Sequence, residues 1–149
     1  MEADAMINDM TMLNFIRQNT QMGRQGIMDV LPKVENENSS FTGALNRQMR
    51  EYENIYAEAD KMLGELGGQR ENISAMSRIS SQMMTTMKTM TDSSVSHIAD
   101  MMIQGSSMGV TKIIQHQKDY DQSNPRITAL ADKLLKTEQN NIEELKKFL

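Results

Sequence analysis

The sequence predicts an all-α protein built as a bundle of long helices. The 149 residues contain two prolines and eight glycines, so long helices can run with few interruptions, and aromatic residues make up only 4% of the chain. Apolar residues also recur at alternating spacings of three and four along most of the chain, which is the period of an amphipathic helix. A chain of this length is expected to fold as one domain, residues 1–149.

The bounds of the expected helices follow from their apolar stripes and from the residues at their ends. Polar side chains such as Asn, Asp, Ser and Thr cap helix starts, whereas proline and glycine mark helix ends. The helices are expected at 9–31, 40–66, 71–90, 93–120 and 125–148. The signals are Asp9 or Thr11 and Pro32 for the first, Ser39 or Ser40 and the glycines 67 and 68 for the second, Asp92, Ser93 or Ser94 for the fourth, and Asn124 with Pro125 for the last.

The segment that joins the two helical hairpins, residues 69–91, indicates the topology. A link of two residues would give an up-down-up-down bundle, whereas a link of this length can carry the chain back along the bundle and hold a short extra helix. The last expected helix reads NPRITALADKLLKTEQNNIEELKKFL, with an Asn-Pro start and a Lys-rich end. In these features the chain resembles small bacterial proteins of the ferritin-like superfamily without an assigned role and, in outline, the helical spore-coat family. The resemblance implies a ferritin-like four-helix bundle of two hairpins joined by a crossover.

The sequence lacks the residues that a di-iron site of that superfamily needs. Such sites take a Glu from each of two helices and a Glu-x-x-His motif from each of the other two. Here Glu138 is followed three positions later by Asn141, and no glutamate of the segment 40–66 has a histidine partner. The two histidines, His97 and His116, lie about 28 Å apart by helical rise, so they cannot share a site. Since no known catalytic motif occurs either, we expect a non-enzymatic protein without catalytic residues.

Glu138 interrupts the apolar stripe of the last expected helix and has two interpretations. It can be a carboxylate that hydrogen-bonds to water or to a hydroxyl group, because antiparallel pairing of the last two helices brings Ser106 and Ser107 to its level. Alternatively, it can be a metal ligand. We favour the hydrogen-bonded carboxylate, since the imidazole of the metal motif is missing.

Glycines inside the expected helices predict close helix packing. Each interior glycine costs about 1 kcal/mol of helix stability relative to alanine, so something should lie close against Gly105 and Gly109. The last helix or the methionine-rich link can fill that place. Gly23 and Gly26 are expected to serve the first helix in the same way.

Sixteen methionines are the most unusual feature of the composition. Thioethers fill irregular gaps in a core, which is the interpretation that we favour for most of them. They are also soft ligands that select Cu(I), and a copper site would draw on Met83, Met87, Met90, His97, Met101 and Glu138. A third use is an adaptable surface for partner helices. An apolar stripe that the bundle leaves partly uncovered would become an interface between copies, most simply in a twofold dimer.

Charge and composition narrow the expected partners and location. The net charge of −4 lacks the positive field that draws proteins to nucleic acid, and the absence of cysteine excludes thiolate metal sites. With no signal peptide and no long apolar run, the chain is expected to be cytoplasmic and not to bind a membrane. We therefore expect a binding or scaffolding protein that self-associates through its methionine-rich helical surface and holds no cofactor. The alternative is a Cu(I)-binding protein with copper as its cofactor.

Overall fold

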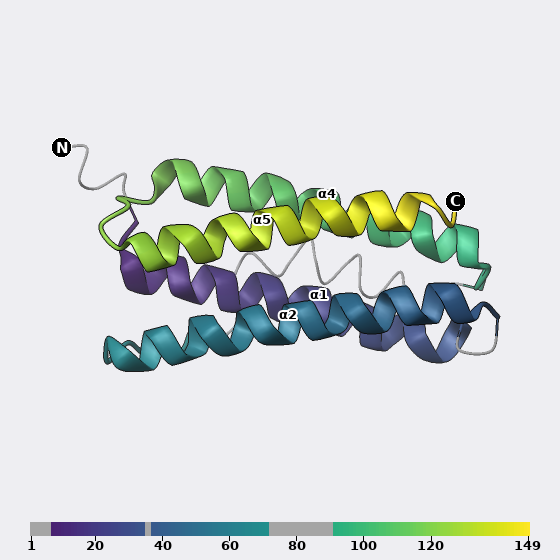
Figure 1. Cartoon of the computed structure of the whole chain (residues 1–149), viewed down its shortest axis with the longest axis horizontal. Coiled ribbons are helices and arrows are strands. Elements are labelled where there is room, and N and C mark those ends of the chain that lie inside the picture. Colours follow the sequence, from purple (N-terminus) through teal and green to yellow (C-terminus); the bar gives the residue numbers. More distant parts are fainter. Residues whose placement is uncertain (1–6, 35–36, 72–90) are drawn as a thin grey trace.

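A computed structural model describes residues 7–34, 37–71 and 91–149, which form four long helices lying side by side (Figure 1). Helix α1 spans Asp9–Val34, α2 spans Ser39–Glu65, α4 spans Val95–Asp119 and α5 spans Pro125–Lys146. The prediction of an all-α four-helix bundle is thereby confirmed. The short extra helix expected at 71–90 lies, apart from its first residue, outside the described residues. Among the described helices, none has both the length and the apolar run that a bilayer-spanning segment needs.

The helices form two antiparallel hairpins. Arg17 near the start of α1 pairs with Asp60 near the end of α2 at 3.1 Å. In the second hairpin, Gln117 near the end of α4 donates to Asp132 in the first half of α5 at 2.9 Å. Helices α2 and α4 run in the same direction (Figure 1), so residues 66–94 connect opposite ends of the bundle.

Side-chain caps begin the helices, and two of them lie one residue or more before the predicted positions. Ser94 accepts from the N–H of His97, and Asn124 accepts from the N–H of Arg126 with Pro125 at the first helical position, as predicted. For the first two helices the caps are Asn8, which accepts from the N–H of Thr11, and Asn38, which accepts from those of Ser40 and Phe41. An Asn side chain caps as well as Ser or Asp. The predicted cap Asp9 instead accepts hydrogen bonds from Tyr120 and Ser123 of the α4–α5 connection.

The predicted end of the first helix at Pro32 is wrong, because α1 continues to Val34. A proline in a helix removes one backbone hydrogen bond and strains the preceding turn. Val30 and Val34 are both completely buried, and keeping this apolar row in the core offsets the lost bond. The end of α2 is as predicted: Gly67 has a φ of +68°, which a residue with a side chain rarely adopts.

The core lies between all four helices. Its largest fully buried side chains are Met12, Leu13, Ile16, Ile27, Phe41, Leu45, Ile55, Leu63, Ile98, Ile113, Ile127 and Leu134. Residues 12–20 of α1 are buried on every side of the helix, polar residues included. One of these, Asn14, donates to the carbonyl of Gln69 at 2.9 Å and accepts from the N–H of Glu71 at 3.0 Å. These two bonds hold the chain that leaves α2 against α1.

A buried cation fastens the same region. Arg17 is only 5% exposed and bonds to Asp60 at 3.1 Å, to Asn14 at 2.9 Å and to the Tyr56 hydroxyl at 3.2 Å. Arg70 donates to the same Asp60 carboxylate at 2.6 Å. Hydrogen bonds and charge from Arg70, and then from Arg17, lower the pKa of Asp60. The buried charge is therefore fully paired, as a charge removed from water must be.

Candidate functional site

The centre of the bundle holds a buried carboxyl group, that of Glu138 in the middle of α5. This residue is 3% exposed. The hydroxyl of Tyr52, in the middle of α2, donates a short hydrogen bond to its Oε1 atom. The Ser106 hydroxyl of α4 lies near both groups and lowers the pKa of the carboxyl and that of the Tyr52 hydroxyl. The carboxyl group of α5 thus lies near hydroxyl groups from two other helices.

Two amide side chains complete the surroundings of this carboxyl. Asn141, one turn beyond Glu138 on α5, donates to the Tyr52 hydroxyl at 3.4 Å. Asn19 of α1 is 6% exposed, and its amide nitrogen lies 3.6 Å from the place where a Cβ of Gly109 would be. All four helices therefore contribute to one polar cluster, which we call the central cluster: Asn19, Tyr52, Ser106, Glu138 and Asn141.

Two glycines make room for the central cluster. A Cβ at Gly109 of α4 would lie 2.8 Å from Glu138 Oε2, so the glycine lets the carboxyl pack in its present position against the α4 backbone. A Cβ at Gly23 of α1 would lie 2.6 Å from the ring of Tyr52. The predicted close packing is confirmed at both positions, with α5 as the neighbour of Gly109. At Gly26 an added Cβ would meet none of the described residues within 4 Å, so the prediction is wrong there.

Burial changes the acidity of both titratable groups of the cluster. It raises the pKa of Glu138 to about 7, although hydrogen bonds from Tyr52 and Ser106 act in the opposite direction. It also raises the pKa of Tyr52 well above its usual range, and the neighbouring Glu138 adds to this effect. Removing a carboxylate from water without a cation partner disfavours its charged form. The site therefore binds a proton near neutral pH, with Tyr52 remaining a neutral hydrogen-bond donor.

The residues of the predicted copper site are not brought together where the structure describes them. Met83, Met87 and Met90 lie outside the described residues. His97 and Met101 are one turn apart near the start of α4 and are both half-buried. Glu138 instead packs at Gly109, about 18 Å along α4 from His97 by helical rise. Within the described ranges, no three His, Asp or Glu side chains are grouped so that they could hold a metal ion.

The other histidine has a packing role. The ring of His116 stacks on that of Phe15 with centroids 3.6 Å apart, and its Nδ1 atom lies 2.8 Å from the carbonyl oxygen of Lys112. The side chain is half-buried, and the ring stacking and the contact with the backbone carbonyl satisfy it. His116 therefore joins α4 to α1 and leaves the central cluster without an imidazole.

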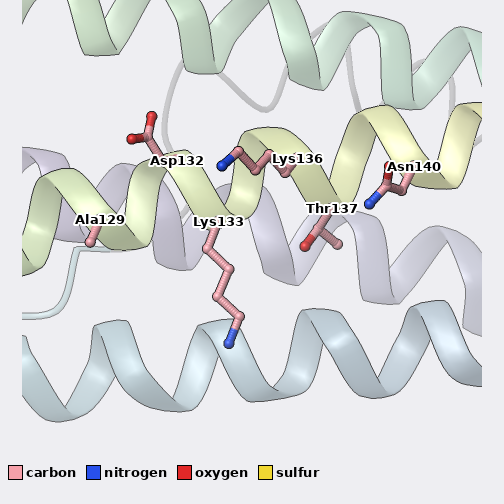
Figure 2. A pocket seen from close by; sticks show the side chains of 6 residues that line it. All are labelled: Ala129, Asp132, Lys133, Lys136, Thr137 and Asn140. Atoms are coloured by element: carbon pink, nitrogen blue, oxygen red, sulfur yellow. The ribbon is translucent and has the colours of Figure 1, made fainter.

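The outer face of α5 has an open, polar depression (Figure 2). Its lining residues all come from this one helix: Ala129, Asp132, Lys133, Lys136, Thr137 and Asn140. Lys133 points toward α2, whereas Asp132 points to the opposite side, toward α4. Side chains of both charges on one exposed helix face are typical of a solvated surface.

Sequence reasoning found Glu138 and its neighbour Ser106 but missed Tyr52. The spacing of Tyr52 placed it in the apolar stripe of the second helix, where it does lie, at 3% exposure. A tyrosine that is buried usually finds a hydrogen-bond partner for its hydroxyl. The available signal for Tyr52 was its position, because it lies in the middle of its helix as Glu138 does in the middle of another. The lateral register that brings the two together was not readable from either stripe.

The described fold is similar to a solved bacterial structure. The comparison is with the crystal structure of a DUF305 fragment from Deinococcus radiodurans, at a TM-score of 0.64 and 15% sequence identity. The match covers 91% of this chain and 93% of that chain. At this identity the likeness shows a shared helical fold and no more. No protein-family model and no curated protein sequence matches the chain.

Proposed function

We propose that this protein is a non-enzymatic binding or structural protein with a ferritin-like bundle, which associates with a second copy through surface methionines. Two antiparallel hairpins, joined by a chain that connects opposite ends of the bundle, support the ferritin-like topology. The central cluster supports a structural role for the bundle centre, because its hydroxyl, amide and carboxyl groups bond to each other.

The distribution of methionine carries the proposal of self-association. Nine methionines lie in the described residues, and of these Met12, Met62 and Met102 are buried. Four others are half-buried, and Met10 and Met28 are each 41% exposed. Methionine is among the residues most often found inside proteins, so six partly accessible methionines are unusual. A surface of flexible thioether side chains repacks readily against a partner helix. A second copy of the chain presents the same thioether surface to it.

The oligomeric state tests this proposal. We expect sedimentation velocity over a range of protein concentrations to show a dimer that dissociates on dilution. The double variant Met10→Gln/Met28→Gln is expected to weaken the dimer at least tenfold, because it removes exposed apolar side chains. Met12→Leu serves as the matched control, since it replaces a fully buried methionine with a residue of similar volume. A chain that is monomeric at every concentration would contradict the proposal.

Cu(I) binding is the second candidate function. It is favoured by His97 and Met101, which lie at i and i+4 and hence on one side of α4, with both side chains half-buried. The test is the metal content of protein purified without a chelator, measured by mass spectrometry across the gel-filtration peak. Copper near one ion per chain that is lost in Met101→Leu supports this function. A protein free of copper after expression in copper-supplemented medium contradicts it.

A further inference from the structure

The middle of α4 is the part of the described bundle that the core holds least. Only four of the 25 residues of α4 are buried, compared with 12 of 26 in α1. None of these four lies between residues 103 and 112. That stretch also contains Gly105 and Gly109, and each glycine lowers helix stability by about 1 kcal/mol relative to alanine. A segment with few buried apolar contacts and low helix propensity opens at a low free-energy cost.

This stretch packs against the core with Ile103 and also makes a close contact to a titratable group. At Gly109 the α4 backbone packs against Oε2 of Glu138, and Ser106, one turn earlier on α4, lies near the same carboxyl. A neutral carboxyl group avoids the cost of burying a charge, and it still accepts the hydrogen bond from the Tyr52 hydroxyl. A charged carboxylate there is cut off from water, and no cation of the described residues lies beside it, which is costly.

Within the part of the chain that the structure describes, none of the groups that face Glu138 carries a charge near neutral pH. Helix α1 presents Asn19, α4 presents Ser106 and the backbone of Gly109, and α5 itself presents Asn141, none of which titrates. Helix α2 presents Tyr52, which stays protonated because burial raises its pKa. The charged residues beside Tyr52 on α2, Glu51 and Glu53, are both exposed.

We propose that Glu138 is a proton-controlled latch, which holds the middle of α4 against the bundle while protonated and releases it when ionised. In the released state residues 103–112 move away from α5 and water reaches the carboxylate. Because burial raises the pKa of Glu138 to about 7, the closed state keeps its proton up to neutral pH. Opening then becomes more favourable as the pH rises from about 5 to 7 and levels off above 7. The device opens the centre of the bundle within the physiological pH range.

Amide hydrogen exchange of the full chain, read by mass spectrometry, tests the latch. We compare the wild type with Glu138→Gln at equal pH, so that the intrinsic pH dependence of exchange cancels. The ratio of wild-type to variant exchange rates in peptides covering residues 103–112 is expected to be at least about tenfold larger at pH 8 than at pH 5. Peptides covering residues 41–49 of α2 are expected to be much better protected from exchange than residues 103–112 at both pH values, because their amides exchange only when the whole bundle unfolds. Glu143→Gln is the matched control, because it removes an exposed charge from the same helix, and we expect it to behave as the wild type.

Two outcomes would overturn the latch. One is an unchanged ratio for residues 103–112 between pH 5 and pH 8. The other is equal protection from exchange in residues 103–112 and in the other three helices, which would show that the middle of α4 opens only when the whole fold is lost. A second variant keeps the test decisive if Glu138→Gln folds poorly. Tyr52→Phe removes a hydrogen bond that lowers the pKa of Glu138, so the pH at which opening levels off should move upward, and no movement would contradict the latch.

Discussion

Replacing two glycines of α1 by alanine is expected to change stability in opposite directions, although they lie three residues apart on one helix. Alanine is favoured over glycine inside a helix by about 1 kcal/mol. At Gly26 the new Cβ would meet none of the described residues within 4 Å, so Gly26→Ala should gain the whole of this amount. At Gly23 the new Cβ would lie 2.6 to 2.8 Å from three ring atoms of Tyr52. Real Cβ contacts do not become that short, so the ring or the helix must shift.

The size of the opposing effect follows from how firmly the Tyr52 ring is held. The ring is 3% exposed, and its hydroxyl is tied to Glu138 and Asn141, so it cannot turn away freely. Overpacking a core costs about 1 to 3 kcal/mol, and a fixed ring belongs at the upper end of that range. After subtracting the gain in helix propensity, Gly23→Ala should destabilise the protein by about 1 to 2 kcal/mol.

Urea unfolding followed by circular dichroism at 222 nm measures both changes against the wild type. We expect the midpoint to rise for Gly26→Ala and to fall for Gly23→Ala, with equal slopes. The double variant Gly23→Ala/Tyr52→Ala removes the ring, so in that background the Gly23 substitution should no longer destabilise. If Gly23→Ala and Gly26→Ala stabilise the protein equally, Tyr52 does not pack on Gly23 and the described centre of the bundle is wrong.

Three further predictions concern the buried carboxyl, the helix caps and the buried cation. The fold raises the pKa of Glu138 from 4.5 to about 7, so the stability that its protonated carboxyl contributes is fully present below pH 4.5 and is lost as the pH rises to 7. Wild-type stability should therefore fall by about 3 kcal/mol over that interval, and Glu138→Gln should abolish the fall. Urea unfolding between pH 4.5 and 8 measures this. Asn38→Ala should cost about 1 kcal/mol in the same assay and Ser39→Ala only a few tenths, and the reverse order would place the cap at Ser39. Arg17→Met should cost about 3 kcal/mol, because it removes a buried partner of Asp60; a neutral result would show that Arg70 alone satisfies the carboxylate.

The sequence predicted the four described helices well, because their signals are local. The stop at Gly67 and the start at Asn124–Pro125 both depend on backbone geometry within one or two residues. Prediction failed at Pro32, where the local signal for a helix end was overruled by the burial of Val34. The caps of the first two helices, Asn8 and Asn38, each lie one residue before a predicted cap, because neighbouring Asn, Asp and Ser side chains can all cap the same helix start.

The central cluster was predictable only in part. The interruption of an apolar stripe pointed to Glu138, and the antiparallel pairing of the last two helices pointed to Ser106, which lies near it and lowers its pKa. Tyr52 is 86 residues away from Glu138 in the chain. Whether the two meet depends on the position of α2 relative to α5 along the bundle axis. The residue pattern within either helix does not predict that relative position.

The sequence by itself determined where the helices run, which faces are apolar and that a long link separates the two hairpins. These properties depend on interactions between residues three or four positions apart, so they can be predicted from the local amino-acid sequence. The tertiary structure alone decided which polar residues meet in the middle of the bundle and that Glu138 lies there without a charged partner among its described neighbours. That choice depends on the lateral register of four helices, which is set by the packing of the whole core at once.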